Sequence, residues 1–232
     1  MPGPLSIFAK DFFNLFYPPL CATCSNVLLS QESHVCTACL YNMPRTNFHL
    51  DTHNPMAQVF WGRVKVENAA AMYYFEKGSK CRKILHQIKY RGKRELARYI
   101  GSIYGTELLR TGRYTDIELI LPVPLHHTKY KKRGFNQSEW FAKGLSEVLD
   151  KPLLEGVLVR LLGAETQTGK SRIERWENVK DNFRVRLPEM IENKHVLLVD
   201  DVVTTGATLE ACACVLLSNP GVRISILTLA YA

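Results

Sequence analysis

Apolar and polar positions beyond residue 60 follow two alternating patterns. Short apolar runs typical of buried strands occupy residues 68–75, 117–124, 153–161, 194–201 and 223–232. Segments with apolar residues at helical spacing occupy residues 81–90, 94–110, 136–149 and 206–218. Strands that alternate with helices predict an α/β fold built on a mainly parallel, doubly wound sheet. Because ligands of such sheets bind beyond the carboxyl ends of strands, we expect a site after Pro124, Leu162 or Asp200.

The first 21 residues are rich in aromatic side chains. Apolar residues recur there at helical spacing, at Leu5, Phe8, Phe12, Leu15 and Phe16. We expect a short amphipathic helix that ends at Pro18 and Pro19 and packs on the main domain; the alternative is a helix on a membrane surface. The apolar run is too short to span a bilayer and lacks a signal-peptide pattern. We therefore expect a cytoplasmic protein without a membrane span.

Four of the seven cysteines form two C-x₂-C pairs: Cys21, Cys24, Cys36 and Cys39. Without an export signal, a disulfide framework is not expected. Each pair can turn two sulfurs toward one point, and the 11-residue spacer lets the second pair complete a tetrahedron. We predict one structural zinc ion per chain, with His34 as a competing ligand. Residues 1–58 would form the N-terminal helix and zinc ribbon, and residues 59–232 the α/β domain.

The net charge of +8 favours an anionic partner, either phosphates or nucleic acid. Four thiolates holding one Zn²⁺ would lower this charge to about +6, which is still basic. A modest positive excess is also common among soluble proteins that bind neither ligand. The charge therefore limits the class of partner without selecting one.

The stretch GAETQTGKS at residues 163–171 resembles a P-loop of nucleotide-binding enzymes. A P-loop has four residues between its glycines, whereas Gly163 and Gly169 enclose five. The extra residue changes the path of the loop, so its N–H groups would not converge on one phosphate. The segment also follows at least two strands, whereas a P-loop normally opens its domain. An ATPase is therefore not expected.

The stretch VLLVDDVVTTGATL at residues 196–209 carries the most specific chemistry. A buried strand would deliver Asp200 and Asp201 to the edge of the sheet. Hydroxyls, a glycine and free N–H groups at the start of the next helix would make a cradle for one phosphate. The cradle residues are Thr204, Thr205, Gly206, Ala207 and Thr208. Two carboxylates beside a phosphate suit the diol of a ribose 5-phosphate or its bound Mg²⁺; the alternative is a helix cap and a turn without a ligand.

This stretch resembles the phosphoribosyl-pyrophosphate (PRPP) motif of type I phosphoribosyltransferases. Further segments resemble the ComF competence proteins, which couple a zinc ribbon to this fold: QIKYRGKRELA (87–97), LPVPLHHTKYKKRGFNQSEWFAKGL (121–145), TQTGKSRIERWENVKDNF (166–183) and the two cysteine pairs. The resemblance covers most of the chain. It implies a type I phosphoribosyltransferase fold with a small N-terminal zinc ribbon.

The resemblance also implies roles for individual residues. Asp200 and Asp201 would be catalytic and hold the ribose hydroxyls and Mg²⁺, and the threonine turn would hold the 5-phosphate of PRPP. The loop at Val123 and Pro124 would bind pyrophosphate. Basic residues would stabilise the leaving group, although each is equally compatible with a solvated surface charge: Lys129, Lys132 and Arg133, then Lys89 and Arg91. Residues 163–182 would form a lid with Thr166, Gln167, Lys170, Arg172 and Arg175.

Two functions agree with the resemblance. The first is a transferase that passes phosphoribose from PRPP to an unknown acceptor; Thr204 replaces the acidic base of purine-salvage members, so purine salvage is not expected. The second is a module that handles single-stranded DNA during uptake, together with DNA-uptake machinery such as a helicase. Basic clusters at 82–98 and 129–133 would then bind phosphates. Interleaved aromatic residues would stack on bases or lie in the core: Tyr90, Tyr130, Phe135 and Trp140.

Overall fold

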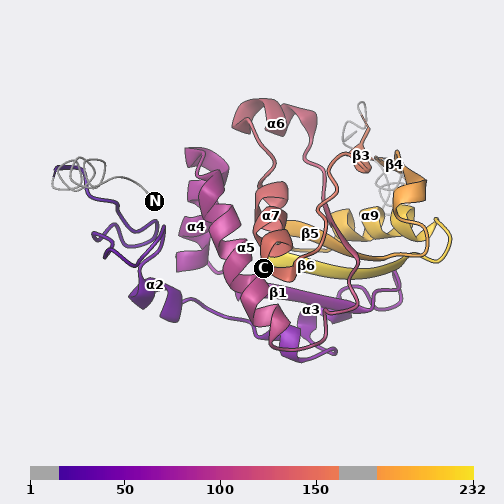
Figure 1. Ribbon diagram of the computed structural model, residues 1–232, viewed down its shortest axis with the longest axis horizontal. Coiled ribbons are helices and arrows are strands. Elements are labelled where there is room, and N and C mark those ends of the chain that lie inside the picture. Colours follow the sequence, from indigo (N-terminus) through magenta and orange to yellow (C-terminus); the bar gives the residue numbers. More distant parts are fainter. Residues whose placement is uncertain (1–15, 162–181) are drawn as a thin grey trace.

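A four-stranded parallel sheet forms the centre of the protein, in a computed structural model that describes residues 16–161 and 182–232 (Figure 1). Its strands lie in the order β1-β6-β5-β2, and every neighbouring pair is parallel. Their bounds are Asn68–Tyr74 (β1), Arg223–Tyr231 (β6), His195–Val203 (β5) and Leu119–Pro122 (β2). These strands fall within or overlap the predicted apolar runs, so the α/β prediction is confirmed.

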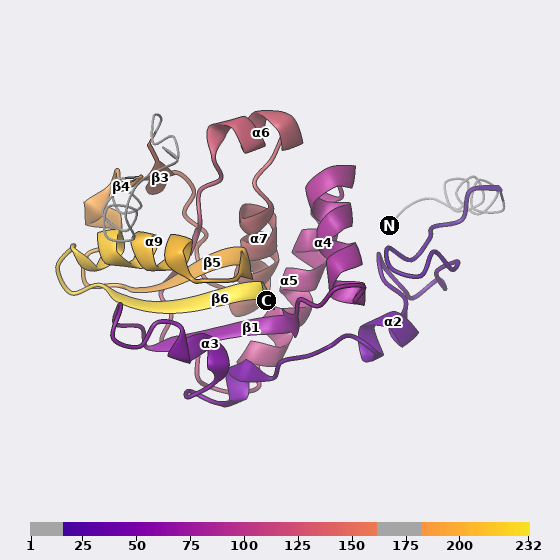
Figure 2. The same ribbon diagram turned by 180° about the vertical axis from the view of Figure 1, so that it is seen from behind.

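Helices cover both faces of this sheet. Helices α5 (Arg94–Leu109) and α7 (Gln137–Leu149) lie in front of the strands in Figure 1, and α9 (Ala207–Leu217) lies in front of them in Figure 2. Residues Val196 to Val199 of β5 are completely buried. A continuous apolar run of this kind is typical of a strand that is covered on both faces. The sheet is therefore doubly wound, as the sequence predicts.

Helices α5 and α7 cross at two glycines. A Cβ atom at Gly101 would overlap the carbonyl oxygen of Phe141, and one at Gly144 would overlap the carbonyl oxygen of Arg98. The two helix backbones therefore touch where side chains would normally separate them. This close crossing places the N-terminus of α7 against the carboxyl ends of the strands.

Helix α4 (Lys80–Arg91) begins and ends where the sequence signals it. The side chain of Ser79 caps its N-terminus by accepting a hydrogen bond from the N–H of Arg82. Gly92 ends it in the left-handed conformation, with φ of 69°. The helix therefore stops just after Lys89 and Tyr90. Lys89 thereby reaches Asp201, near the carboxyl end of β5.

Two of the predicted elements differ from the structure. The run at 153–161 forms a strand only at Leu158–Arg160 (β3), which pairs antiparallel with Phe183–Val185 (β4) in a separate two-stranded sheet. Gly156, with φ of 73°, interrupts the run, and Leu153 makes only a single bridge to Ile120 of the main sheet. The basic cluster predicted at 129–133 lies on a short helix that the apolar pattern does not predict, α6 (His127–Arg133), none of whose residues is buried.

The N-terminal segment continues into the sheet domain further upstream than predicted. Helix α2 (Thr37–Tyr41) belongs to the cysteine-rich part, whereas the 3₁₀ helix Phe48–Leu50 (η1) and α3 (Pro55–Gln58) pack on β1. The N–H of Thr46 donates to the carbonyl of Met72, and the N–H of Tyr74 to that of Pro44. We therefore propose that the boundary between the two parts lies near Asn42 rather than at residue 58.

The remaining regions add little to the site. A second 3₁₀ helix, η2, spans Pro188–Met190. The helix predicted at the N-terminus falls almost wholly within residues 1–15, which lie outside the described residues. Among the described residues, the structure contains no helix with the length and apolar character needed to cross a membrane.

A hydrogen-bonded network holds the amino ends of the strands. The Nδ1 atom of His195 lies 2.9 Å from a carboxylate oxygen of Asp116, and its Nε2 atom lies 3.0 Å from the hydroxyl of Ser225. Arg223 also bonds Asp116, at 3.1 Å. Because His195 and Ser225 are almost fully buried, the network links β5 to β6 inside the protein, while Asp116 and Arg223 are half-exposed at its outer end.

The helix crossing gives a stability prediction. Gly144→Ala is expected to lower the free energy of unfolding by about 3 kcal/mol, because the new methyl group meets backbone atoms that cannot move aside. Gly105→Ala is the matched control on the same pair of helices. Its methyl group would lie 3.0 Å from Cβ of Val148, a much smaller overlap than that with the carbonyl oxygen of Arg98 at position 144. Urea unfolding of both variants checks the prediction, and an equal effect at the two positions would contradict it.

Candidate functional site

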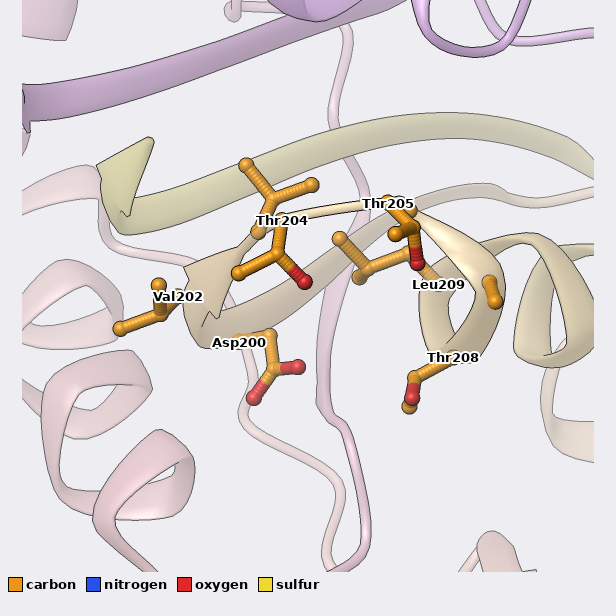
Figure 3. Close-up of a pocket in the computed structure, with 9 residues that line it drawn as sticks. Asp200, Val202, Thr204, Thr205, Thr208 and Leu209 are labelled. Atoms are coloured by element: carbon orange, nitrogen blue, oxygen red, sulfur yellow. The ribbon is translucent and has the colours of Figure 1, made fainter. Parts of the chain in front are cut away.

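A small pocket lies where β5 passes into α9. It has a volume of about 60 Å³ and is lined by Asp200 and by residues 202–209. Figure 3 shows the hydroxyls of Thr204, Thr205 and Thr208 and the carboxylate of Asp200 around one open space. The side chains of the three threonines are exposed. The pocket therefore presents several hydroxyls and one carboxylate to a ligand from solvent.

The backbone of this turn also suits an anion. Gly206 is the N-cap of α9 and adopts the left-handed conformation, with φ of 75°. The first N–H groups of a helix have no acceptor within it, and the helix dipole adds a partial positive charge there. A Cβ atom at position 206 would lie 2.6 Å from a methyl carbon of Val59. Glycine is therefore required both by the backbone conformation and by the neighbouring side chain.

Asp200 is held by two hydrogen bonds to the same oxygen. The hydroxyl of Ser138, in the first turn of α7, donates to Oδ1 at 2.7 Å, and the N–H of Asp201 donates at 2.8 Å. Burial raises the pKa of Asp200 to about 7, and the charge of Asp201 adds to the rise, while these hydrogen bonds oppose it. The second oxygen is left to face the pocket, where it can bind a hydroxyl or a hard cation.

Asp201 has a different partner. Its side chain is nearly buried, and Oδ2 lies 2.7 Å from Nζ of Lys89 on α4. Successive residues of a strand point in opposite directions, so two adjacent acids need not act on one ligand. The pair predicted to lie side by side is therefore divided between a pocket-facing Asp200 and an ion-paired Asp201. Lys89, one of the residues expected at the leaving group, forms an ion pair with Asp201 in this structure.

The loop after β2 is fixed by its backbone. The N–H of Val123 donates to the carbonyl of Val199 at 2.8 Å, and the buried side chain of Asn136 donates to the carbonyl of Val123 at 3.0 Å. Asn136 also caps α7. Asn136 and Ser138 support the loop and Asp200 through their side chains, and motif matching did not select them. A polar residue at the predicted start of a helix was the available signal.

A second cavity lies beside this loop. It has a volume of about 270 Å³ and is lined in part by Pro124, Tyr130, Glu139, Glu155 and Arg160. Burial raises the pKa of Glu139 to about 7, and the neighbouring Glu155 adds to the rise. The cavity combines apolar walls with a carboxyl pair.

The basic residues expected to stabilise the leaving group do not line the pocket after β5. Lys129 and Lys132 are exposed on α6. Arg133 donates to the side-chain oxygen of Gln137 at 2.8 Å, and its guanidinium lies 5.8 Å from the ring of Tyr90. The predicted lid, with Lys170 and Arg172, lies outside the described residues.

The four cysteines of the two pairs converge on one point. Their sulfur atoms all lie within 4.8 Å of one another, and those of Cys24 and Cys36 are 3.7 Å apart. A tetrahedron with Zn–S bonds of about 2.3 Å has sulfur–sulfur edges of about 3.8 Å, so the group has the right size for zinc. His34 lies elsewhere, with its ring 5.4 Å from that of Tyr99 on α5. The competing histidine ligand is thus not brought to the cluster.

The cysteine cluster contacts the α/β domain through α4 and α5. Nζ of Lys83 donates to the carbonyl of Thr23 at 3.2 Å, within the first C-x₂-C pair. The hydroxyl of Thr23 lies 3.2 Å from the sulfur of Cys21. Cys81 and Cys212 are buried and Cys214 is half-buried, and none of the three belongs to the cluster. The ribbon is therefore attached to the helix that also carries Lys89.

Taken with its threonine turn, this sheet defines a phosphoribosyltransferase-type α/β domain, and residues 131–232 match the family described as Phosphoribosyl transferase domain. The DNA utilization protein YhgH of Escherichia coli O157:H7 is 29% identical over 89% of the chain and 88% of its own length. Competence protein F of Haemophilus influenzae is 38% identical over 44% of each chain. Competence protein ComFC of Bacillus subtilis is 30% identical over 62% of the chain and 57% of its own length. Together, these similarities support assignment of the chain to the ComF family of competence proteins.

The cysteine cluster gives a metal prediction. The purified protein is expected to hold about one zinc ion per chain, and Cys36→Ser is expected to lose it and to unfold the ribbon, because so short a segment has little core of its own. Cys214→Ser, on α9, is the control and should keep the metal. Elemental analysis measures both. A folded wild-type protein without metal would contradict the zinc ribbon.

Proposed function

We propose that the protein binds PRPP, or another ribose 5-phosphate, together with Mg²⁺ in the pocket after β5. The observation that carries this proposal is the convergence of three hydroxyls, a helix N-terminus and one carboxylate on a pocket of about 60 Å³. Hydroxyls and N–H groups donate to a phosphate, whereas a carboxylate accepts from a sugar hydroxyl. A ligand with both groups a few ångströms apart satisfies both halves of the pocket.

Each residue has a separate task in this proposal. Thr204 to Thr208 and the first turn of α9 hold the 5-phosphate. Asp200 accepts a ribose hydroxyl or binds Mg²⁺, whose preferred ligands are oxygens, and Ser138 sets the direction of its carboxylate. Lys89 holds Asp201 in its ion pair. The bound cation would neutralise pyrophosphate as it leaves the ribose carbon. The acceptor of the phosphoribosyl group would approach that carbon from the side opposite the pyrophosphate.

We propose a second activity, binding of single-stranded DNA. The site would be a basic–aromatic surface formed by the end of α4, the start of α5, α6 and α7. Tyr90 and Tyr130 are 62% and 50% exposed. The guanidinium of Arg94 lies 4.6 Å from the ring of Trp140, and Nζ of Lys143 lies 5.1 Å from it. Figure 1 shows α4 and α6 beside each other, in agreement with the contact of Arg133 with Tyr90.

This surface has the chemistry of a strand-binding site. Cations bind the phosphates of a nucleic-acid strand, and exposed aromatic rings stack on its bases. Phe135 does not contribute to it, because this side chain is only 7% exposed. The relatives named for competence and for DNA utilization support the proposal, as does the net charge of +8. DNA-uptake machinery, such as a helicase, would be the partner in this activity.

The pocket gives a ligand-binding prediction. PRPP with Mg²⁺ is expected to raise the melting temperature of the wild-type protein, and Asp200→Asn with Asp201→Asn is expected to abolish the rise because no carboxylate remains for the diol or the cation. Asp150→Asn is the control, since Asp150 lies at the end of α7 in a left-handed conformation that asparagine also adopts. Thermal melting with and without PRPP measures each variant. An undiminished rise in the double variant would contradict the site.

The basic–aromatic surface gives a DNA-binding prediction. Lys131→Glu with Lys132→Glu is expected to weaken binding of a labelled single strand roughly tenfold and to lower the salt slope by about 1.4, because two phosphate contacts are lost. Lys65→Glu with Arg113→Glu is the charge-matched control. Both residues are exposed, and they precede β1 and β2, at the end of the sheet where the strands begin. Fluorescence anisotropy at several salt concentrations measures both. Equal weakening by the two pairs would show that net charge alone is responsible.

A further inference from the structure

Arg63, a residue that no motif includes, binds the phosphate turn from outside the pocket. Its Nη1 atom donates to the carbonyl of Thr205 at 2.9 Å and to the carbonyl of Val59 at 3.1 Å. Its Nη2 atom bonds the carboxylate of Glu210, which lies in the first turn of α9 and is 2% exposed. One guanidinium therefore connects the segment before β1, the turn and α9.

The bond to Thr205 fixes the direction of a peptide group. Because the peptide is planar and trans, its C=O and the following N–H point in opposite directions. Arg63 is not among the residues that line the pocket, so the carbonyl that it binds points out of the pocket. The N–H of Gly206 then points away from Arg63. The contact thus holds the acceptor of this peptide group on the outer side of the turn.

Such a peptide needs a restraint. Glycine populates positive and negative φ about equally, so the plane between Thr205 and Gly206 has two accessible orientations. The reversed orientation would place a carbonyl oxygen where the phosphate binds. Val59 and Phe60 also lie close behind the turn, since a Cβ atom at position 206 would contact both side chains. Residues 59–63 therefore form the back wall of the turn.

The charge of Arg63 does not explain its position. Its guanidinium is ion-paired with the nearly buried Glu210, so little net positive charge remains for a phosphate. A planar guanidinium instead offers several donors in fixed directions, which one ammonium group cannot reproduce. The geometry thus favours orientation of the turn over direct attraction of the ligand.

We propose that Arg63 is a positioning residue for phosphate binding, which locks the Thr205–Gly206 peptide with its N–H directed at the anion. This inference rests on the proposed function of the same pocket. If the lock keeps the binding-competent orientation populated, its removal lowers the affinity in proportion to the population that is lost.

The test compares Arg63→Met and Arg63→Lys with the wild-type protein, using ribose 5-phosphate with Mg²⁺ as the probe. Titration calorimetry is expected to show a roughly twofold higher Kd for both variants, since about half of the molecules would keep the competent peptide when the two orientations are equally populated. Arg223→Met is the matched control, because Arg223 also pairs with a carboxylate but at the other edge of the sheet. It should bind as the wild-type protein does.

A spectroscopic measurement separates positioning from general damage to the fold. In amide NMR spectra, saturating ribose 5-phosphate is expected to move the Gly206 resonance strongly in the wild-type protein and weakly in Arg63→Met, while the Thr208 resonance moves in both. Equal Kd values, or a Gly206 shift that survives in Arg63→Met, would overturn the inference and leave the proposed pocket intact. Absence of binding by the wild-type protein would overturn both the pocket and the inference.

Discussion

The parallel pairing of β2 with β5 is the constraint on which the functional end of the molecule depends. Its register aligns Leu119 with Val196 and Pro122 with Val199. Parallel strands end at the same edge of a sheet, so the loop after Pro122 and the turn after Val203 emerge together. The N–H of Val123 extends the ladder by one more bond, to Val199. Only with this alignment can Ser138, at the start of α7, reach Asp200.

Burying two adjacent carboxylates at this edge imposes a second constraint. An unpaired buried charge is costly, and two like charges on successive residues raise the cost further. The structure separates them by giving each its own donors, a hydroxyl and an N–H for Asp200 and an ammonium group for Asp201. Each donor comes from a different helix or strand. The acids therefore fix the positions of α4 and α7 as much as those helices fix the acids.

At the opposite end of the sheet, where the strands begin, the polar side chains are bonded to one another. There, His195 is bonded to both Asp116 and Ser225, and Arg223 completes the network. The buried His195 and Ser225 are bonded within the protein, and the half-exposed Asp116 and Arg223 are paired with each other, so this network stabilises the starts of the strands. At the functional edge, by contrast, the hydroxyls of Thr204, Thr205 and Thr208 face open space. Hydroxyls that face open space thus distinguish the carboxyl ends of the strands from their amino ends, and this places the candidate site without the use of any motif.

Hydrophobic periodicity predicted the parallel strands and the long helices because it reports burial of whole elements. Helix α6 escaped prediction because none of its residues is buried, so it has no apolar face to detect. The run at 153–161 misled because its pairing partner, β4, lies further along the chain, and sequence patterns do not encode partners. The threonine turn before α9 was predictable from local residues alone. Its supports were not: Ser138 lies 62 residues from Asp200, and Arg63 lies 147 residues from Glu210.

The two proposed binding sites use different chemistry although helix α4 belongs to both. In the pocket, the donors are backbone N–H groups and threonine hydroxyls, and the nearby cations Arg63 and Lys89 are already paired with acids. On the basic–aromatic surface, the donors are exposed charged side chains of α6. Salt screens exposed charges strongly and fixed dipoles in a pocket weakly. A ribose phosphate would therefore stay bound at salt concentrations that release a nucleic-acid strand, so the two sites would respond separately although Lys89 and Tyr90 are adjacent in one helix.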